Sequence, residues 1–505
     1  MAQYILAHDL GTSGNKATLY DEQGRLCGSC TISYPTLYPC PGGVEQNPDS
    51  WWGAVCRGTQ QLLTESAVKA GEIACVCFSA QMMGCLLVDL QGNPLHRALI
   101  WADTRSQEEE KELLHSVGQQ EGYQITGHRL SASYSAAKLL WLRKNAPDSY
   151  KKAYKLLQAK DYMVYRLTGK FYTDYSDASG TNLLDICHKC WSKSILKEME
   201  IDGGLLPELR KSTDVVGGIT ASAASATGLL EGTPVVMGGG DGSCACVGAG
   251  VTEPGKAYTV IGTSSWISYA STEPFFDPEM RTFNWVHLDD KLYAPCGTMQ
   301  AAGYSYSWFR DIFCHEEVVA AKGKGVSPYS LMDELAAQSV PGAHALLFLP
   351  YLLGERSPWW DSFAKGTFIG FSATTTRADF SRAVLEGVGY NLKVILDILQ
   401  SVGPLEKIAM IGGGAKSSFW LQLLANIWQK PLEVPQYIEE ATSMGAAICG
   451  GVGVGLFPNF RVADMFNQVQ KTILPDASLA KEYEKMYQVF NMAYQQLVPV
   501  FRRLA

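Results

Sequence analysis

The sequence predicts an α/β protein built from two similar halves. Apolar stretches of strand length alternate with helical ones, which is the pattern of an α/β domain. One strand–turn–strand pattern also occurs twice, first over residues 5–16 (Ile-Leu-Ala-His-Asp-Leu-Gly-Thr-Ser-Gly-Asn-Lys) and again over 258–266 (Tyr-Thr-Val-Ile-Gly-Thr-Ser-Ser-Trp). In a chain of 505 residues, a repeated turn of this kind indicates a duplicated fold with a domain in each half.

Both copies of the turn are suited to binding an anion. Glycine lets the backbone turn tightly, and the Thr and Ser hydroxyls and successive N–H groups can point at phosphate oxygens. Asp9 lies just before the first copy, whereas the apolar Ile261 lies just before the second. A carboxylate beside a phosphate-binding turn suggests a bound Mg²⁺. We therefore expect the two halves to hold one nucleotide between them.

The first half is expected to open with three strands, followed by a mixture of helices and buried strands. The strands are expected at residues 4–8, 16–20, 26–34, 73–78 and 86–89, and the helices at 106–117, 136–145 and 161–167. A further helix after residue 48 can be capped by Asp49 or Ser50.

The chain becomes rich in glycine over residues 200–235, and the strand pattern restarts after Gly250. The predicted domains are therefore 1–249 and 250–505. In the second half we expect a strand at 408–411 and helices at 377–399, at 417–428, after Ala441 and at 479–497.

Composition argues against several kinds of partner. Lys plus Arg number 42 and Asp plus Glu 50, a net charge of −8, whereas nucleic-acid-binding proteins carry basic patches. No run of about 18 apolar residues predicts a membrane span, and no signal peptide is visible at the N-terminus. We therefore expect a cytoplasmic protein that binds neither nucleic acid nor membrane.

The 14 cysteines fit a reducing compartment better than a disulfide scaffold. Two pairs, Cys27 with Cys30 and Cys187 with Cys190, have the spacing of zinc ligands. Other cysteines, such as Cys75 and Cys77, occupy apolar positions, which favours buried or incidental thiols over a zinc site.

Asp241 is the first candidate for catalysis. It lies in Gly238-Gly-Gly-Asp-Gly-Ser243, between an apolar strand and a helix of small residues, where glycines let a ligand approach the backbone. A carboxylate there can accept a proton from a substrate hydroxyl. The alternative is a helix N-cap, but the upstream Asp9 turn favours catalysis.

Three further segments follow expected strands, where ligands bind in open α/β sheets. Gly412-Gly-Gly-Ala-Lys-Ser-Ser418 allows close approach of a flat ring or a phosphate, or is an ordinary glycine-rich connection. Gln81-Met-Met-Gly84 and Trp101-Ala-Asp103 offer an indole and a carboxylate, which suit a polyol. The alternatives are core packing for the methionines, and a helix cap or a pair with Arg105 for Asp103. Neither a Walker A pattern nor a Rossmann fingerprint occurs.

Taken together, these segments resemble the FGGY carbohydrate kinases of the sugar-kinase, actin and heat-shock ATPase superfamily, and among them most closely the xylulokinases. The likeness covers nearly the whole chain, and its motifs occur in family order. They are Asp9-Leu-Gly-Thr-Ser, Glu45-Gln-Asn-Pro48, Gln81-Met-Met-Gly84, Trp101-Ala-Asp103, Ser133-Tyr-Ser-Ala-Ala-Lys-Leu-Leu-Trp-Leu142, Gly239-Gly-Asp-Gly242, Gly262-Thr263, Gly354-Glu-Arg-Ser-Pro358, Gly412-Gly-Gly-Ala415 and Ala441-Thr-Ser-Met-Gly-Ala446.

The resemblance implies two ribonuclease-H-like (actin-like ATPase) domains with a cleft between them that binds ATP and Mg²⁺. Asp241 would be the general base, and Asp9 would help to hold Mg²⁺, directly or through water. The phosphates would meet Gly11, Thr12, Ser13, Lys16, Gly262 and Thr263, and the adenosine would meet Gly303, Gly414, Ala415 and Ser418. The sugar would meet Gln81, Met82, Met83, Gly84, Trp101, Asp103 and Asp241. Family members are often dimers, so a homodimer is one expected assembly.

The expected reaction is ATP-dependent phosphorylation of a terminal hydroxyl of a small sugar or polyol, with a ketopentose such as D-xylulose as the first candidate. One departure concerns this acceptor: xylulokinases usually have a Met-His pair where this chain has Met82-Met83, and a thioether hardly hydrogen-bonds a hydroxyl. Ribulose, erythritol or another polyol are therefore alternatives. Rivals of another class are an inactive sugar sensor and an actin-like ATPase.

Overall fold

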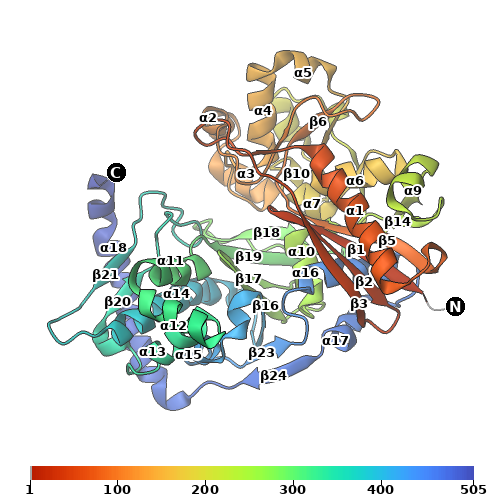
Figure 1. The fold of residues 1–505 in the computed structure, drawn as a ribbon. Helices are drawn as coiled ribbons and strands as arrows, with labels where there is room; N and C mark the ends of the chain where they lie inside the picture. The colour runs from red at the N-terminus through yellow and green to blue at the C-terminus, as the bar shows by residue number, and fades with distance from the viewer. Residues whose placement is uncertain (1–2, 505) are drawn as a thin grey trace.

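Two seven-stranded mixed sheets form the centres of the two halves of the computed structural model, which describes residues 3–504 (Figure 1). The first sheet has the order β13-β14-β5-β1-β2-β3, with β15 also paired to β5. Its strands are β1 (Tyr4–Leu10), β2 (Gly14–Asp21), β3 (Leu26–Ser33), β5 (Ile73–Ala80), β13 (Val215–Gly218), β14 (Pro234–Val236) and β15 (Gly239–Gly240).

The second sheet has the order β18-β19-β17-β16-β22-β23-β24. Its strands are β16 (Ala257–Ile261), β17 (Ser265–Tyr269), β18 (Phe283–Val286), β19 (Tyr293–Met299), β22 (Ile408–Ile411), β23 (Leu432–Pro435) and β24 (Val469–Ile473). In each sheet a hairpin (β1–β2, β16–β17) has its first strand parallel to a strand that comes much later in the chain (β5, β22). The duplication predicted from the two turns is therefore present in the topology.

Two helices pack against each other where the halves meet. They are α10 (Asp241–Gly248), which ends the first half, and α16 (Ala441–Gly453), which belongs to the second. Their backbones touch, because a Cβ on Gly248 would lie 1.7 Å from the Ala441 carbonyl oxygen and one on Gly445 would lie 1.9 Å from that of Cys244. Small residues at these positions thus allow a helix contact too close for any side chain.

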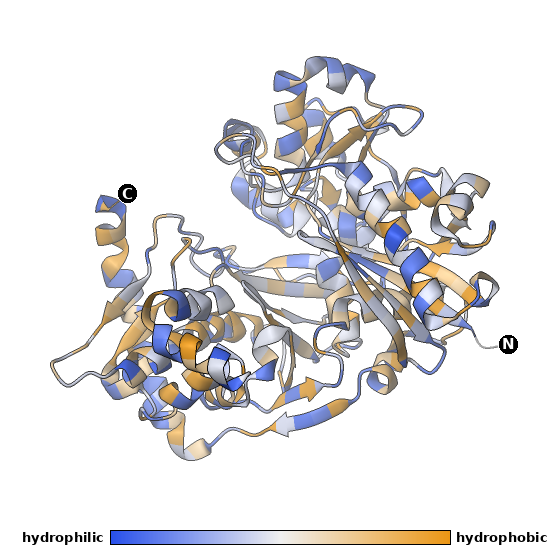
Figure 2. Ribbon diagram, in the orientation of Figure 1, coloured by the Kyte–Doolittle hydropathy of each residue, from blue (hydrophilic) through white to orange (hydrophobic). Residues whose placement is uncertain are grey.

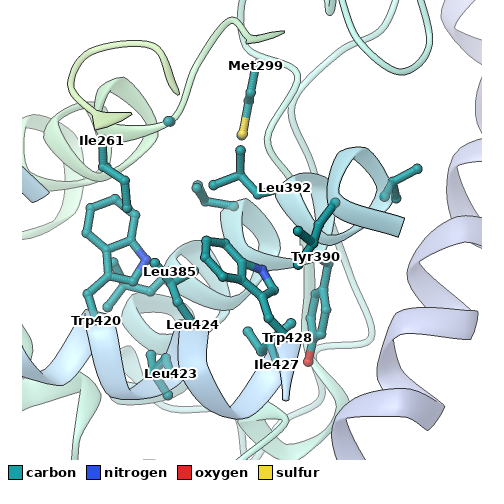
Figure 3. Packing of buried hydrophobic residues seen from close by; sticks show 14 of the residues in the cluster. Ile261, Met299, Leu385, Tyr390, Leu392, Trp420, Leu423, Leu424, Ile427 and Trp428 are labelled. Atoms are coloured by element: carbon teal, nitrogen blue, oxygen red, sulfur yellow. The ribbon is translucent and has the colours of Figure 1, made fainter. Parts of the chain in front are cut away.

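The hydrophobic core follows the sheets. Hydrophobic residues concentrate along the central strands, and hydrophilic ones on peripheral helices (Figure 2). In the second half, α14 (Arg377–Leu399) and α15 (Ser418–Trp428) bury Leu385, Leu392, Leu424 and Trp428, with Trp420 and Ile261 beside them (Figure 3). Burial of such side chains stabilises the fold by about 1.5–3 kcal/mol each. This core therefore supports the turn between β16 and β17.

Element boundaries agree with the sequence expectations apart from a few ends. The helix α1 (Pro48–Ser66) is capped by Asn47, whose side chain accepts from the Asp49 N–H, so the predicted cap at Asp49 or Ser50 was wrong by two or three residues. The last helix, α18 (Ala480–Arg503), runs six residues past its predicted end at 497. Within residues 3–504, no helix is long and apolar enough to cross a bilayer.

Candidate active site

The first turn connects β1 to β2 and carries Asp9 on its strand side. The Gly11 N–H donates to the Gly14 carbonyl (3.0 Å), which closes the turn, and Asp9 pairs with Lys16 across the hairpin. The Ser79 hydroxyl donates to Asp9 Oδ1 at 2.9 Å, and Oδ2 has no protein hydrogen-bond partner among residues 3–504. Burial raises the pKa of Asp9, while the Ser79 hydrogen bond and the Lys16 charge oppose that shift. One oxygen of Asp9 is therefore oriented and the other is open to a ligand.

Asp241 lies opposite this turn at the first position of α10. The N-cap is Gly240, so Asp241 is not itself the cap, and its Oδ1 accepts only from the adjacent Gly242 N–H (2.7 Å) among the described residues. Burial and the negative charge of Asp9 raise the pKa of Asp241 to about 7. The two carboxylates thus share one electrostatic environment, and Asp241 has the proton affinity that a general base needs near neutral pH.

Gln81 and the following methionines come directly after β5, beside the Asp241 backbone. Gln81 is buried and donates to Gln46 Oε1 (2.7 Å), while its own Oε1 is without a partner within residues 3–504. A Cβ on Gly240 would lie 2.4 Å from Met82 Sδ, so Met82 touches the backbone that precedes Asp241. Met83 has φ +63°, which is uncommon for a side-chain-bearing residue and costs free energy. The structure therefore brings Met82 to the backbone before Asp241, with Gln81 and Met83 on either side of it in the chain.

A buried lysine, Lys138, holds the segment that carries Met83 in place, although no role was predicted for it from the sequence. Lys138 Nζ donates to the carbonyls of Met83 (2.9 Å), Ile100 (2.7 Å) and Ser133 (2.6 Å). Burial lowers the pKa of Lys138 to about 7. Because its three acceptors come from three separate segments, Lys138 ties the segment after β5 to the one that carries Trp101. Lys138 lies within the motif over 133–142, but a single Lys in a predicted helix is usually interpreted as a surface residue.

Trp101 and Asp103 have different surroundings. Trp101 Nε1 donates to Thr12 Oγ1 (2.9 Å), so the indole joins the acceptor side to the phosphate turn. Asp103 is fully buried, accepts from the Val44 N–H (2.7 Å) and pairs with Arg105 (2.7 Å), which also pairs with Glu45. The carboxylate of Asp103 is therefore already occupied by protein groups, as the pairing alternative anticipated, and direct contact with a sugar gains no support.

The second turn borders a cavity of about 460 Å³ in the second half. Gly262 and Thr263 line the cavity together with Gly303, which begins α11 (Gly303–Phe313) and whose N–H donates to the Gly262 carbonyl (2.9 Å). Gly414 also lines it, after Gly412 has turned the chain with φ +84°. The remaining walls are Ile261, Tyr304, Tyr306, Ser307, Ser327, Tyr329, Ser330, Asp333, Gly413, Lys416, Ser417 and Trp420. The size and aromatic walls are those of a small-ligand pocket.

Two predicted nucleotide residues lie outside this lining. Ala415 is buried beneath it, and Ser418 accepts a hydrogen bond from Lys471 (3.0 Å). Ser417 lines the cavity instead, and its hydroxyl donates to Asp333 (2.6 Å). Ser418 begins α15 and turns away because Ser417 is the N-cap, whose side chain must face the first turn of that helix.

Lys16 spans the boundary between the halves. Its Nζ donates to the Glu439 carbonyl (2.8 Å) and lies 3.7 Å from Glu440 Oε1, just before α16. Ser13, in the same turn, is exposed. Within residues 3–504, no cluster of three or more His, Cys, Asp or Glu side chains is arranged to hold a metal ion. A single carboxylate with one open oxygen, as at Asp9, fits Mg²⁺, which is usually held by one or two carboxylates together with substrate phosphates.

Comparison with known proteins agrees with this geometry. The N-terminal domain of the FGGY family of carbohydrate kinases matches residues 4–248, and its C-terminal domain matches 257–454. The chain is 33% identical to the xylulose kinase of Bacillus subtilis over 495 residues, covering 97% of both chains. It is 30% identical to the gluconokinase of the same organism over 493 residues, covering 97% of this chain and 95% of the relative.

Solved structures of the same kind superpose over the full length. A ligand-bound xylulose kinase from Lactobacillus acidophilus gives a TM-score of 0.92 at 26% identity, and a gluconate kinase from that organism gives 0.93 at 26%, each covering 100% of both chains. The predicted ribonuclease-H-like fold of two domains is thereby confirmed. The chain belongs to the FGGY family of carbohydrate kinases and is a sugar-phosphorylating enzyme similar to the xylulose kinases.

Proposed function

We propose that the enzyme transfers the γ-phosphoryl group of ATP to a terminal hydroxyl of a small sugar, with Asp241 as the general base. The observation that carries this proposal is the pair Asp241 and Asp9, whose charges interact between the acceptor segment and the phosphate turn. D-Xylulose is the first candidate acceptor, because the xylulose kinase of Bacillus subtilis is 33% identical over nearly the whole chain.

The reaction follows from the positions of these groups. Asp241 accepts the proton of the sugar hydroxyl while the hydroxyl oxygen forms a bond to the γ-phosphorus. The bond from that phosphorus to the β–γ bridging oxygen breaks, and ADP leaves. Such transfers proceed through a loose transition state, so orientation and charge neutralisation supply most of the rate enhancement. Gly11, Thr12 and Lys16 from the first turn and Gly262 and Thr263 from the second would contact the phosphates.

The remaining predicted residues divide between the two reactants. Gly303 and Gly414 would contact the adenosine in the 460 Å³ cavity, with Ser417 in place of Ser418. Asp9 would hold Mg²⁺, which supplies neutralising charge on the phosphate oxygens when bound. Gln81, Met82, Met83, Gly84 and Trp101 would contact the acceptor.

A second acceptor class, the sugar acids, is favoured by one side chain. The Arg356 guanidinium lies 5.9 Å from the Trp101 ring centre and has no hydrogen bond or ion pair among residues 3–504. Burial raises the pKa of Tyr134, beside Met82 and Met83, and the Arg356 charge opposes that shift. The charged side chain that shifts the pKa of Asp241 is instead Asp9. Arg356 is half-buried, and burial lowers its pKa. A carboxylate at the far end of the acceptor would supply the hydrogen-bonded partner that its guanidinium lacks. The gluconokinase relatives, at 30% identity, agree with this class.

The test is ADP release by the purified enzyme with Mg²⁺-ATP against D-xylulose, ribulose, erythritol and gluconate. One strong responder is the expected result. ADP release that does not depend on any acceptor would support the actin-like ATPase, and none at all would support the sensor. Arg356→Met separates the two acceptor classes: loss with gluconate alone supports carboxylate recognition, whereas equal loss with neutral sugars contradicts it.

A further inference from the structure

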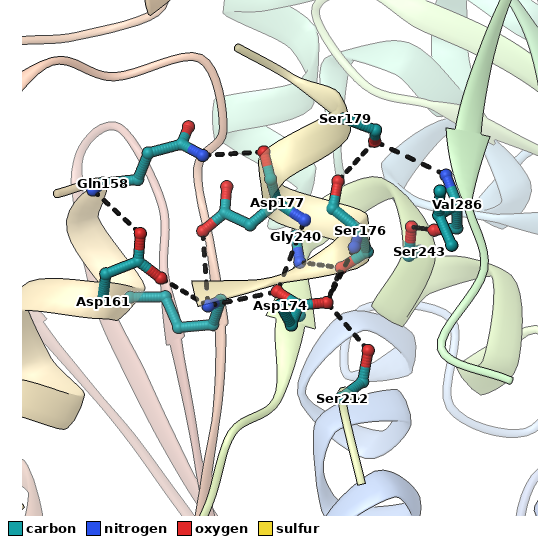
Figure 4. A network of polar contacts seen from close by, with 12 residues as sticks. Gln158, Asp161, Asp174, Ser176, Asp177, Ser179, Ser212, Gly240, Ser243 and Val286 are labelled. Atoms are coloured by element: carbon teal, nitrogen blue, oxygen red, sulfur yellow. Dashed lines mark hydrogen bonds and ion pairs between the residues drawn. The ribbon is translucent and has the colours of Figure 1, made fainter. Parts of the chain in front are cut away.

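A buried group of charged side chains lies close to Gly240, the residue before Asp241, and takes no direct part in the proposed reaction (Figure 4). The group, here called the Lys160 cluster, consists of Lys160 and Asp161 on α6 (Ala159–Thr168), Asp174 at the end of β9 (Tyr172–Asp174) and Asp177 on α7 (Tyr175–Ser179). Lys160 Nζ lies 2.7 Å from Asp161, 3.1 Å from Asp174 and 3.6 Å from Asp177. All four side chains are at most 1% exposed, so this charge is held at a desolvation cost.

A chain of hydrogen bonds connects this cluster to the backbone of Asp241. Asp174 Oδ2 accepts from the Ser176 hydroxyl (2.5 Å) and from the Ser212 hydroxyl (2.8 Å). The Ser176 oxygen in turn accepts from the Gly240 N–H (3.0 Å), which is the residue before Asp241 (Figure 4). Of these two serines, which share one carboxylate oxygen, only Ser176 has a hydrogen bond to Gly240 among the described residues.

Charge gives this chain its direction. An ionised carboxylate only accepts hydrogen bonds, so the Ser176 hydroxyl must donate to Asp174 and its oxygen lone pairs are left for Gly240. Lys160 Nζ lies 3.1 Å from Asp174 Oδ1 and offsets the negative charge of that carboxylate in this buried site. Loss of the Asp174 carboxylate as an acceptor would allow the hydroxyl of Ser176 to turn and release the Gly240 N–H.

The backbone that Ser176 holds is packed too closely for any side chain. A Cβ on Gly239 would lie 2.6 Å from Ser176 Oγ, and one on Gly240 would lie 2.4 Å from Met82 Sδ. The two glycines are therefore clamped between Ser176 on one side and the acceptor segment on the other. A displacement at Ser176 would be passed directly to the position of Asp241 relative to Met82.

We propose that the Lys160 cluster positions the base: Lys160 fixes Asp174, Asp174 orients Ser176, and Ser176 holds the Gly240 backbone so that Asp241 faces the acceptor hydroxyl. Lys160, Asp174 and Ser176 are thus positioning residues and do not touch substrate. The inference rests on the proposed role of Asp241. It explains why an enzyme that needs one carboxylate at the acceptor keeps three more buried around Lys160, 81 residues before Asp241 in the chain.

The matched pair Ser176→Ala and Ser212→Ala tests this inference. Each variant removes one hydroxyl from the same oxygen of Asp174, so both should lower the melting temperature to a similar extent. Ser176→Ala alone frees Gly240 and is expected to lower kcat roughly tenfold to a hundredfold, the cost of misplacing a reacting group by about 1 Å. Its KM for ATP should stay within about twofold of wild type, and Ser212→Ala should keep kcat within about twofold.

Equal kcat values for the two serine variants would overturn the inference, and so would a loss in Ser176→Ala that appears in the KM for ATP with kcat unchanged. If Ser176→Ala does not fold, Ser176→Cys keeps nearly the same shape with a weaker acceptor, and the same fall in kcat is expected. Asp241→Asn separates this inference from the proposed function. If Asp241→Asn retains turnover, Asp241 is not the base and the proposed function is contradicted. If Asp241→Asn is inactive but Ser176→Ala is fully active, only the positioning role of Ser176 is contradicted.

Discussion

The two halves of the molecule use the same strand arrangement for different tasks. The hairpin β1–β2 with its parallel neighbour β5 matches the hairpin β16–β17 with β22, and each hairpin turn contains Gly-Thr-Ser (Figure 1). Asp9 stands two residues before the glycine of the first turn, and Val260 stands at the matching place before the second. A charged side chain thus lies beside the first turn, where phosphates and metal would gather, and an apolar one holds the same position beside the second.

The residues that follow the matching parallel strands differ in the same sense. After β5 the chain continues into Gln81, Met82 and Met83, of which Met82 lies against the backbone before Asp241. After β22 it continues into Gly412, Gly413 and Gly414, which lack side chains, and the last two border the cavity. The two halves thus share one strand arrangement. A few side chains at the strand ends make the first half suited to chemistry and the second half suited to holding a ligand.

Substitution of Gly414, with Gly413 as the control, is the strongest test of the role that this comparison gives to the second half. A Cβ on Gly414 would lie 2.4 Å from the Ile261 side chain, whereas one on Gly413 would meet nothing within 4 Å. Overpacking of this kind costs about 1–3 kcal/mol. We expect Gly414→Ala to raise the KM for ATP about tenfold or more with the acceptor KM unchanged, and Gly413→Ala to change neither. Equal effects of the two substitutions in steady-state kinetics would contradict the assignment of this cavity to the nucleotide.

The pH dependence of the rate tests the first half. Burial and the Asp9 charge raise the pKa of Asp241 to about 7. Only the ionised carboxylate accepts a proton, so kcat/KM for the acceptor should fall about tenfold per pH unit as the pH drops below that pKa, and should level off above it. Measuring kcat/KM from about pH 5.5 to 8.5 checks this. A flat profile across that range would show that no group with this pKa limits the reaction.

The smallest effect is expected at the link between the halves. Lys16 lies 3.7 Å from Glu440, and the two side chains are 28% and 23% exposed, so solvent screens the pair. We expect Glu440→Gln to change the free energy of unfolding by less than about 1 kcal/mol, because the Glu439 carbonyl still holds Lys16. Denaturant unfolding measures this. A loss of several kcal/mol would mean that the halves depend on this ion pair and not on the contact between α10 and α16.

Elements with a strong local signal were predictable from the sequence. The helix α14 begins and ends at the predicted residues, Arg377 and Leu399, because Thr376 and Asp379 form a capping box and the long apolar face continues to its end. The strand β5 was found from its apolar run, although it extends two residues beyond the predicted 73–78. The cap of α1 was misplaced because three residues with capping side chains, Asn47, Asp49 and Ser50, stand within four positions.

The site was predictable where glycine and carboxylate lie on one short segment, as at Asp9 and Asp241. It was not predictable where the partner is distant in the chain. Lys138 contacts carbonyls up to 55 residues away, and Ser176 contacts Gly240 across 64 residues. Whether Asp103 would face a sugar or pair with Arg105 likewise depended on the fold, which buries both beside Glu45. Side-chain partners set by tertiary packing leave no local pattern in the sequence.

The most direct test of the account compares Asp241→Asn with the wild-type enzyme in two measurements on the same preparations. We predict that acceptor-dependent ADP release falls by about 10²–10⁴-fold, the usual contribution of a general base, while calorimetric ATP affinity stays within about twofold of wild type. That result would place the chemistry in the first half and nucleotide binding in the second. Retained turnover, or loss of ATP binding together with turnover, would contradict this division.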